Sequence, residues 1–323
     1  MGSKRLIFAD FTKLFAMFIV TWGHCAQCLS NQDFPYLFGR QGLFVAFHMP
    51  MFMIISGYFI DAERIANTRS WDFLRNKFKR LVIPAVSWYI LYCLLTLHMP
   101  QVESILSFYW FLTSMFLSFS LVLFACKILR NRCFLVVVAL MVIALPYSNV
   151  LNINFMFPMM VGGVFLRQYI ENVSSNKTSL AVWGVLSFFL LQEWDIKYSV
   201  YITPFNTVKL SSDMCTALIF RLVTGFVVSG FFILLFKRIQ SYVIIEKLAV
   251  CGRYTLVMYT ASFILNGVMR RILNMLDFSV VQPVMLEVAS LFWSVSVCIV
   301  SVLIAQVMSK NEIMNKVFLG VYK

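Results

Sequence analysis

The sequence predicts an all-α polytopic membrane protein, and three observations carry this prediction. Of the 323 residues, 61% are hydrophobic and 13% are charged, against about 45–50% apolar and about 25% charged in an ordinary soluble domain. The mean hydropathy is +0.83. The apolar residues form continuous runs rather than an alternation, which argues against membrane β-strands. A soluble enzyme, a disordered chain and a secreted disulfide scaffold do not fit this composition.

The apolar runs predict about ten membrane-spanning helices, because each crossing needs roughly 20 mostly apolar residues. The runs cover residues 8–29, 42–60, 81–97, 104–126, 134–145, 153–166, 180–191, 214–236, 248–269 and 284–308. The first run follows Lys4 and Arg5, as a signal peptide would, but it contains Asp10 and Lys13 and lacks a clear cleavage site. We therefore expect a retained span. With no repeat or linker in sight, we expect one membrane domain over residues 1–323.

The distribution of basic residues predicts the orientation. Twenty-seven Lys and Arg against fourteen Asp and Glu give a net charge of +13. If the N-terminus is cytoplasmic, twenty of the basic residues fall in cytoplasmic segments and five in outer segments. Cytoplasmic loops of membrane proteins carry such an excess. We therefore expect both termini in the cytoplasm and no nucleic-acid partner. The eight cysteines are scattered and predict no metal site.

The first predicted span carries three ionisable side chains, Asp10, Lys13 and His24. Near the membrane centre such groups cost at least ~2.5–3.5 kcal/mol each and usually need a partner or a function. Asp10 and Lys13 share a helix face, so a structural ion pair is the alternative to a functional role. His24 lies eleven residues beyond Lys13, which places it on the same face and about 16 Å further out.

Four polar or aromatic side chains fall at one depth, in the outer third of the membrane. They come from four different spans and are His24, His48, Trp110 and Arg221. Two histidines beside an arginine at one depth predict a site. The alternatives are a hydrogen-bonded core histidine and, for Trp110, an interfacial aromatic belt.

The loop over residues 61–80 is strongly basic. It contains Arg64, Arg69, Arg75, Lys77, Lys79 and Arg80. Membrane anchoring or contact with anionic lipids explains several of these residues. The functional interpretation is a site for a phosphorylated cytosolic ligand, with Lys77 and Arg80 on one helical face.

Five segments carry recognisable motifs. The opening segment, residues 8–24, contains Asp10 and, three positions later, the basic residue Lys13. Ten residues separate Lys13 from His24. The second segment, residues 47–58, reads FHMPMFMIISGY, and the basic segment, residues 75–84, reads RNKFKRLVIP. The fourth-span segment, residues 109–112, is YWFL, and the late segment, residues 252–259, is GRYTLVMY. In this order they resemble the motifs of the integral membrane acyltransferase-3 family.

The resemblance implies ten spans and an O-acyltransferase, in most cases an O-acetyltransferase. The donor would be cytosolic acyl-CoA, chiefly acetyl-CoA as co-substrate, with no bound cofactor. The acceptor would be a hydroxyl of a surface glycan or of its lipid-linked precursor, and the expected location is the bacterial inner membrane. Many family members have a histidine about three residues after the last tyrosine of the late segment, where this chain has Ser262.

The resemblance also suggests roles for the candidate residues. His24 would be the general base, because histidine changes protonation near neutral pH, and an acyl-histidine intermediate is an open alternative. The expected acyl-CoA-binding residues are Lys13, Lys77, Arg80 and Arg75. The expected supporting or acceptor-binding residues are Asp10, His48, Trp110 and Arg221.

Two other classes compete with the acyltransferase. A secondary transporter of a small polar or anionic solute would also have ten spans and polar groups at depth. Transporters tend to have inverted repeats and helices broken by Gly or Pro near the midplane. This chain has only 13 Gly and 8 Pro, which argues against that class. A non-enzymatic scaffold would not explain the intramembrane Asp10, Lys13, His24 and Arg221.

Overall fold

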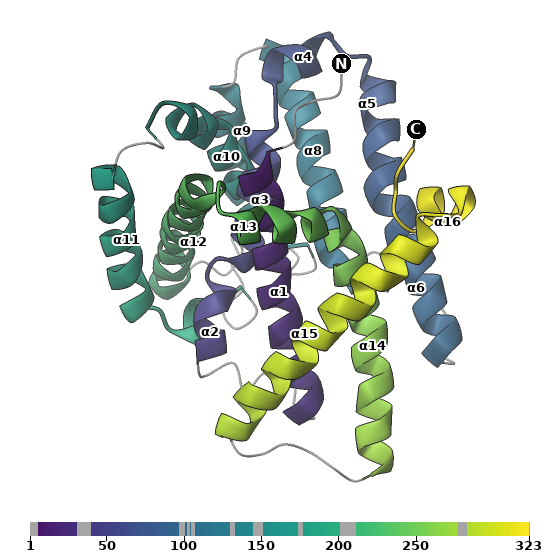
Figure 1. Cartoon of the computed structure of the whole chain (residues 1–323). Coiled ribbons are helices and arrows are strands. Elements are labelled where there is room, and N and C mark those ends of the chain that lie inside the picture. Colours follow the sequence, from purple (N-terminus) through teal and green to yellow (C-terminus); the bar gives the residue numbers. More distant parts are fainter. Residues whose placement is uncertain are drawn as a thin grey trace.

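The computed structural model describes residues 6–30, 40–96, 101, 104, 107–129, 133–144, 151–173, 177–200, 211–276 and 283–322. Within these residues the ordered elements are all helices, so the all-α fold class is confirmed (Figure 1). Six basic residues used for the orientation lie outside the described residues: Lys4, Arg5, Arg130, Arg132, Lys209 and Lys323.

The helices follow the chain in the order of Figure 1. The elements are α1 (Ile7–Ser30), α2 (Arg40–Val45), α3 (His48–Tyr58), α4 (Ala62–Asn67), α5 (Ser70–Lys77), the π-helix η2 (Phe78–Val82), α6 (Ile83–Thr96), α8 (Trp110–Leu129), α9 (Phe134–Ala144), α10 (Ile153–Val173), α11 (Lys177–Gln192), η3 (Ile196–Tyr198), α12 (Ser212–Ile239), α13 (Val243–Ala249), η4 (Val250–Tyr254), α14 (Thr255–Met275), α15 (Pro283–Met308) and α16 (Glu312–Val317). In the described residues, helix is present within each of the ten predicted runs.

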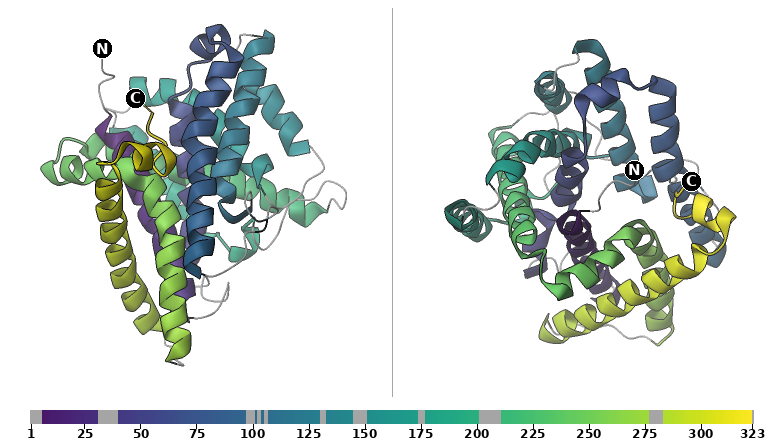
Figure 2. Two further views of the ribbon diagram at one scale, coloured as in Figure 1. Left: turned by 90° about the vertical axis from the view of Figure 1, so that its right-hand side faces the viewer. Right: turned by 45° about the horizontal axis from the view of Figure 1, so that its top comes forward.

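Five described helices are long and apolar enough to cross a membrane. They are Ser70–Thr96, Trp110–Ile128, Ser212–Ile239, Val243–Met275 and Val284–Met308. Shorter apolar helices cover Gly42–Tyr58, Phe134–Ala144 and Lys177–Gln192. The count of ten spans and the cytoplasmic placement of the termini therefore stay predictions. The start of α1 and the short α16 lie toward the same end of the bundle (Figure 2).

The helix α3 lies in the interior of the bundle, because every one of its side chains except Ser56 is buried. It packs along α10 more extensively than any other pair of helices. A Cβ at Gly57 would collide with the Met160 carbonyl oxygen, and a Cβ at Gly163 would collide with the Ile54 carbonyl oxygen. Small residues allow such close approach of helix backbones in membranes. The two glycines therefore set the distance between α3 and α10.

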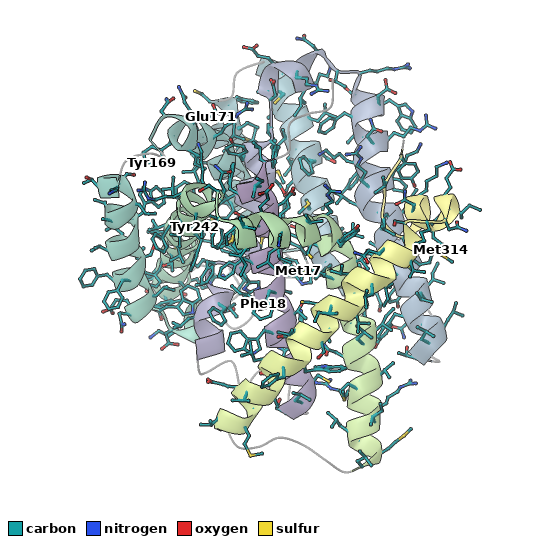
Figure 3. All side chains as sticks on the ribbon, in the orientation of Figure 1. Met17, Phe18, Tyr169, Glu171, Tyr242 and Met314 are labelled. Atoms are coloured by element: carbon teal, nitrogen blue, oxygen red, sulfur yellow. The ribbon has the colours of Figure 1, made fainter. Side chains whose placement is uncertain are left out.

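The helix α1 separates a cavity from a groove, and its consecutive residues Met17 and Phe18 line one each. Met17 lines a cavity of about 180 Å³ between α1, α3, α8 and α14. Phe18 lines an apolar groove of about 410 Å³ between α1 and α15, where α14 also contributes. Figure 3 labels both side chains on α1. The face with Met17 also carries Lys13, so this lysine of the opening segment lines the cavity and not the groove.

The close approach of α3 and α10 predicts the effect of Gly163→Leu. The added side chain has no space beside the Ile54 carbonyl, so the two helices must separate. Overpacking of this kind costs about 1–3 kcal/mol or more. We expect a lower midpoint of thermal unfolding in detergent. The matched control is Gly23→Leu, where a Cβ meets nothing within 4 Å. Equal midpoints for the two variants would contradict the packing described.

Candidate functional site

The cavity beside α1 brings together all five segments identified in the sequence. Its lining residues are Lys13, Met17, Met49, Phe52, Ser56, Leu81, Phe111, Leu112, Met115, Thr255, Leu256 and Tyr259. The opening, second, basic, fourth-span and late segments each contribute at least one of them. Segments that span about 250 residues of sequence therefore converge on one hollow. The polar members are few, as in most small-molecule sites.

The first turns of α1 hold the charged end of this cavity. Lys13 Nζ lies 3.5 Å from Asp10 Oδ1, with side chains 30% and 14% exposed. The ammonium group also lies 5.4 Å from the ring centroid of Phe59. The ion pair foreseen for this face is therefore present, and Lys13 lines the cavity at the same time. The structural and the functional interpretations of Lys13 are compatible.

The late segment is fixed against the opening segment by a glycine. A Cβ at Gly252 would collide with the carbonyl oxygen of Asp10. Only a residue without a side chain allows η4 to lie so close to α1. This contact places Thr255, Leu256 and Tyr259 opposite Lys13. It gives a physical reason for the glycine at the start of the GRYTLVMY motif.

His24 lies near the other end of α1 and does not line the cavity. Its Nδ1 is 3.2 Å from Gln27 Oε1. Its ring centroid is 4.9 Å from that of Phe263 on α14. Phe263 in turn contacts Tyr259, a cavity residue, at 5.4 Å between centroids. Two aromatic rings, one helical turn apart on α14, therefore connect the cavity with His24.

His48, predicted at the same depth as His24, is buried at the start of α3, and α3 packs against α1. Its Nδ1 lies 2.6 Å from the Phe44 carbonyl oxygen. A carbonyl only accepts, so Nδ1 donates and Nε2 is left with the lone pair. His48 can therefore accept, but not donate, a further hydrogen bond while its ring is neutral.

The other two members of the predicted layer are less closely tied to His24. Arg221 is 2% exposed on α12, and its Nε donates to the Ala217 carbonyl oxygen at 3.2 Å. Its helix packs against both α1 and α3. Trp110 is half-buried at the start of α8 and lies beside Phe111, a cavity residue, at 6.0 Å between centroids. Trp110 itself is not among the residues that line the cavity.

The basic segment contains a π-helical turn that the sequence analysis did not foresee. The turn covers Phe78–Val82 and precedes Pro84. Proline has no N–H to offer the carbonyl one turn earlier, which in this helix belongs to Arg80. Wider turns of this kind occur mostly as single bulges within α-helices, often at functional sites. Gly320, with φ of +66°, lies against the same carbonyl from the C-terminal segment.

Lys77 and Arg80 consequently differ in exposure. Lys77 Nζ lies 3.4 Å from the ring centroid of Phe119 on α8 and 5.5 Å from that of Phe73. Arg80 and Arg75 are exposed. The like charges of Lys77 and Arg80 still interact. Lys77 thus faces the bundle, while the two arginines remain accessible at its surface.

Ser262 stands where many members of the family seen in the sequence have a histidine, and it is fully buried. Its hydroxyl donates to the Tyr259 carbonyl oxygen at 2.8 Å, within its own helix. The next residue, Phe263, is the one that meets His24. The sequence analysis missed both Phe263 and Gln27. The signal for Gln27 was available, since a residue three positions after His24 shares its helix face.

The apolar helices indicate an integral membrane protein, and the cavity between them is its candidate small-molecule site. The family model described as an acyltransferase domain matches residues 6–309, and the chain belongs to this acyltransferase-3 family. The protein is therefore a membrane acyltransferase, which favours a transferase over the transporter and the scaffold. No curated protein and no solved structure matches the chain.

The contact of Lys77 with Phe119 predicts unequal effects of two substitutions. Lys77→Ala removes a cation–π contact worth about 0.5–2 kcal/mol and should lower the midpoint of thermal unfolding. Arg80→Ala removes an exposed side chain and should change stability by less than about 0.5 kcal/mol. Thermal unfolding of both purified variants in one detergent measures this difference. Equal stability would mean that Lys77 does not lie on the Phe119 ring.

Proposed function

We propose that the protein transfers an acyl group, most often acetyl, from cytosolic acyl-CoA to a hydroxyl of a surface glycan or of its lipid-linked precursor. The observation that carries the proposal is the single cavity lined by all five segments. It lies between an accessible basic surface and the histidine of the opening segment. The proposed location is the bacterial inner membrane, with the basic surface in the cytoplasm.

The donor would bind with its charged end at the basic segment. Arg75 and Arg80 are exposed. A guanidinium group can form bidentate hydrogen bonds with phosphate oxygens. Lys77 adds a positive charge beside them. The pantetheine arm would enter the cavity, where Leu81 from the basic segment and Lys13 are both lining residues. The thioester would then reach toward the far end of α1.

The chemical step would use His24 as the general base. Its Nε2 takes the proton of the acceptor hydroxyl while the hydroxyl oxygen attacks the thioester carbonyl carbon. The new C–O bond forms, the C–S bond breaks, and the CoA thiolate leaves and takes up the proton. His48 or Arg221 would stabilise the negative charge on the carbonyl oxygen or bind the acceptor. The neutral ring of His48 can only accept a further hydrogen bond, which suits the second role. Trp110 would stack on a sugar ring or pack beside the acyl group.

The role of His24 is tested by His24→Ala. The variant should retain the fold and the binding of acetyl-CoA, but transfer to the acceptor should fall by about 10²–10⁴-fold, the usual contribution of a general base. Purified protein, radiolabelled acetyl-CoA and acceptor glycan from the producing cells give the measurement. Cys133→Ala, at an exposed position before α9, is the control. Unchanged transfer by His24→Ala would refute the mechanism.

The donor site is tested by the double variant Arg75→Gln/Arg80→Gln. Loss of two exposed charge-assisted contacts should weaken acyl-CoA binding by roughly 1–2 kcal/mol, which is about a ten-fold increase in KM for the donor. The KM for the acceptor should stay constant. The matched control, Lys247→Gln/Lys310→Gln, removes two exposed charges elsewhere on the molecule. A change confined to acceptor kinetics would contradict the placement of the phosphates.

A further inference from the structure

His24 has a side-chain partner on its own helix. Gln27 lies three residues later, and its Oε1 is 3.2 Å from His24 Nδ1. An amide oxygen only accepts hydrogen bonds, so Nδ1 carries the proton in this contact. A neutral imidazole has one protonated nitrogen, and its lone pair then lies on Nε2. With the proton on Nδ1, Nε2 is the nitrogen of His24 that can remove a proton.

We propose that Gln27 is the positioning residue for His24, which it holds in the tautomer with a basic Nε2. This inference rests on the proposed function, because it gives His24 the role of the base. Gln27 would act only through the imidazole and would not touch the substrates. In the step described above, the acceptor proton goes to Nε2, while the proton on Nδ1 stays in the bond to Gln27. A ring with Nε2 protonated would have no lone pair to present to the acceptor.

Hydrogen bonds join the last turn of α1, which includes Gln27, to α14. Arg270 Nη2 donates to the Gln27 carbonyl oxygen at 3.1 Å. Cys28 Sγ donates to the Asn266 carbonyl oxygen at 3.2 Å. Carbonyls in the last turn of a helix have no partner within the helix, so this turn would otherwise be free to fray. Contacts from α14 therefore hold the turn that carries the partner of His24.

The second constraint on the imidazole is an aromatic ring. Phe263 lies 4.9 Å from His24 between centroids, with 49° between the planes. The hydrogen bond to Gln27 fixes one edge of the imidazole, and Phe263 limits its tilt. Among the titratable or charged groups near this turn, His48 comes from α3, Arg270 from α14, and Cys25 and Cys28 from α1 itself. The side-chain hydrogen-bond partner that the structure shows for His24 is the neutral amide of Gln27.

A neutral partner is suited to this depth of the membrane. A carboxylate at the position of Gln27 would stabilise the charged imidazolium, as the aspartate does in a Ser-His-Asp triad. It would also bring a charge into an apolar region, which is costly without full pairing. The amide supplies the acceptor that fixes the tautomer and adds no net charge. Gln27 thus meets the geometric requirement without the cost of a second ionised group.

Kinetics of three variants test the proposal. Gln27→Leu keeps a side chain of similar size but removes the acceptor, so kcat should fall by about 100-fold, as for a misplaced catalytic group. The KM for acetyl-CoA and the thermal midpoint should stay constant. Gln27→Glu restores an oxygen at the same position and should recover kcat to within about ten-fold of the unaltered protein. Gln306→Leu, at an exposed position on α15, is the control and should behave as the unaltered protein.

A spectroscopic measurement tests the contact without reference to activity. The chain has three histidines, so ¹⁵N-histidine labelling yields few ring signals, and His24→Ala identifies those of His24. We expect Nδ1 of His24 to be protonated in the unaltered protein and the proton to move to Nε2 in Gln27→Leu. The same tautomer in both proteins, or a proton on Nε2 in the unaltered protein, would overturn the proposal.

The two sets of results separate this inference from the proposed function. If His24→Ala is inactive and Gln27→Leu retains the kcat of the unaltered protein, the positioning role of Gln27 is rejected. The assignment of His24 as the general base is then kept. If His24→Ala is fully active, His24 is not the general base. The positioning role of Gln27 is then rejected too, whichever tautomer His24 adopts. Loss of kcat in Gln27→Leu together with the tautomer change and recovery in Gln27→Glu supports the proposal.

Discussion

A polar side chain in the bilayer core has no water to hydrogen-bond, so its partner must come from the protein. In this chain several of the candidate residues have a partner within four positions in the sequence. Asp10 pairs with Lys13, and His24 contacts Gln27, each three residues apart. His48 and Arg221 each bond the carbonyl of the residue four positions earlier. These contacts are local in sequence, and the packing of the helices arranges the remaining faces of the same side chains.

That packing depends on places where a side chain is absent. Gly57 and Gly163 allow α3 and α10 to approach, and Gly252 allows η4 to approach the backbone of Asp10. Close contact in a membrane cannot rely on a hydrophobic difference between lipid and protein, so it rests on dispersion and shape. The contact at Gly252 holds two walls of the cavity together, while the contacts at Gly57 and Gly163 fix α3, another wall, on α10.

The sequence was sufficient for the helical class, for the positions of the apolar helices and for the family, because hydropathy and motif order are properties of the chain itself. It also predicts one depth for His24 and His48, whose helices α1 and α3 pack against each other. The wider turn before Pro84 was not foreseen, and neither was the inward position of Lys77 on Phe119. The position of Lys77 depends on α8, which carries Phe119 and packs beside α5. Spacing along one helix cannot supply it.

The buried position of α3 has a consequence for the order in which the protein is made. Its eleven residues emerge from the ribosome roughly a hundred residues before α10, the helix on which they pack most extensively. Its contacts with α1 can form early, but the larger part of its packing waits for α10. The site therefore assembles late, although most of its motifs are translated early.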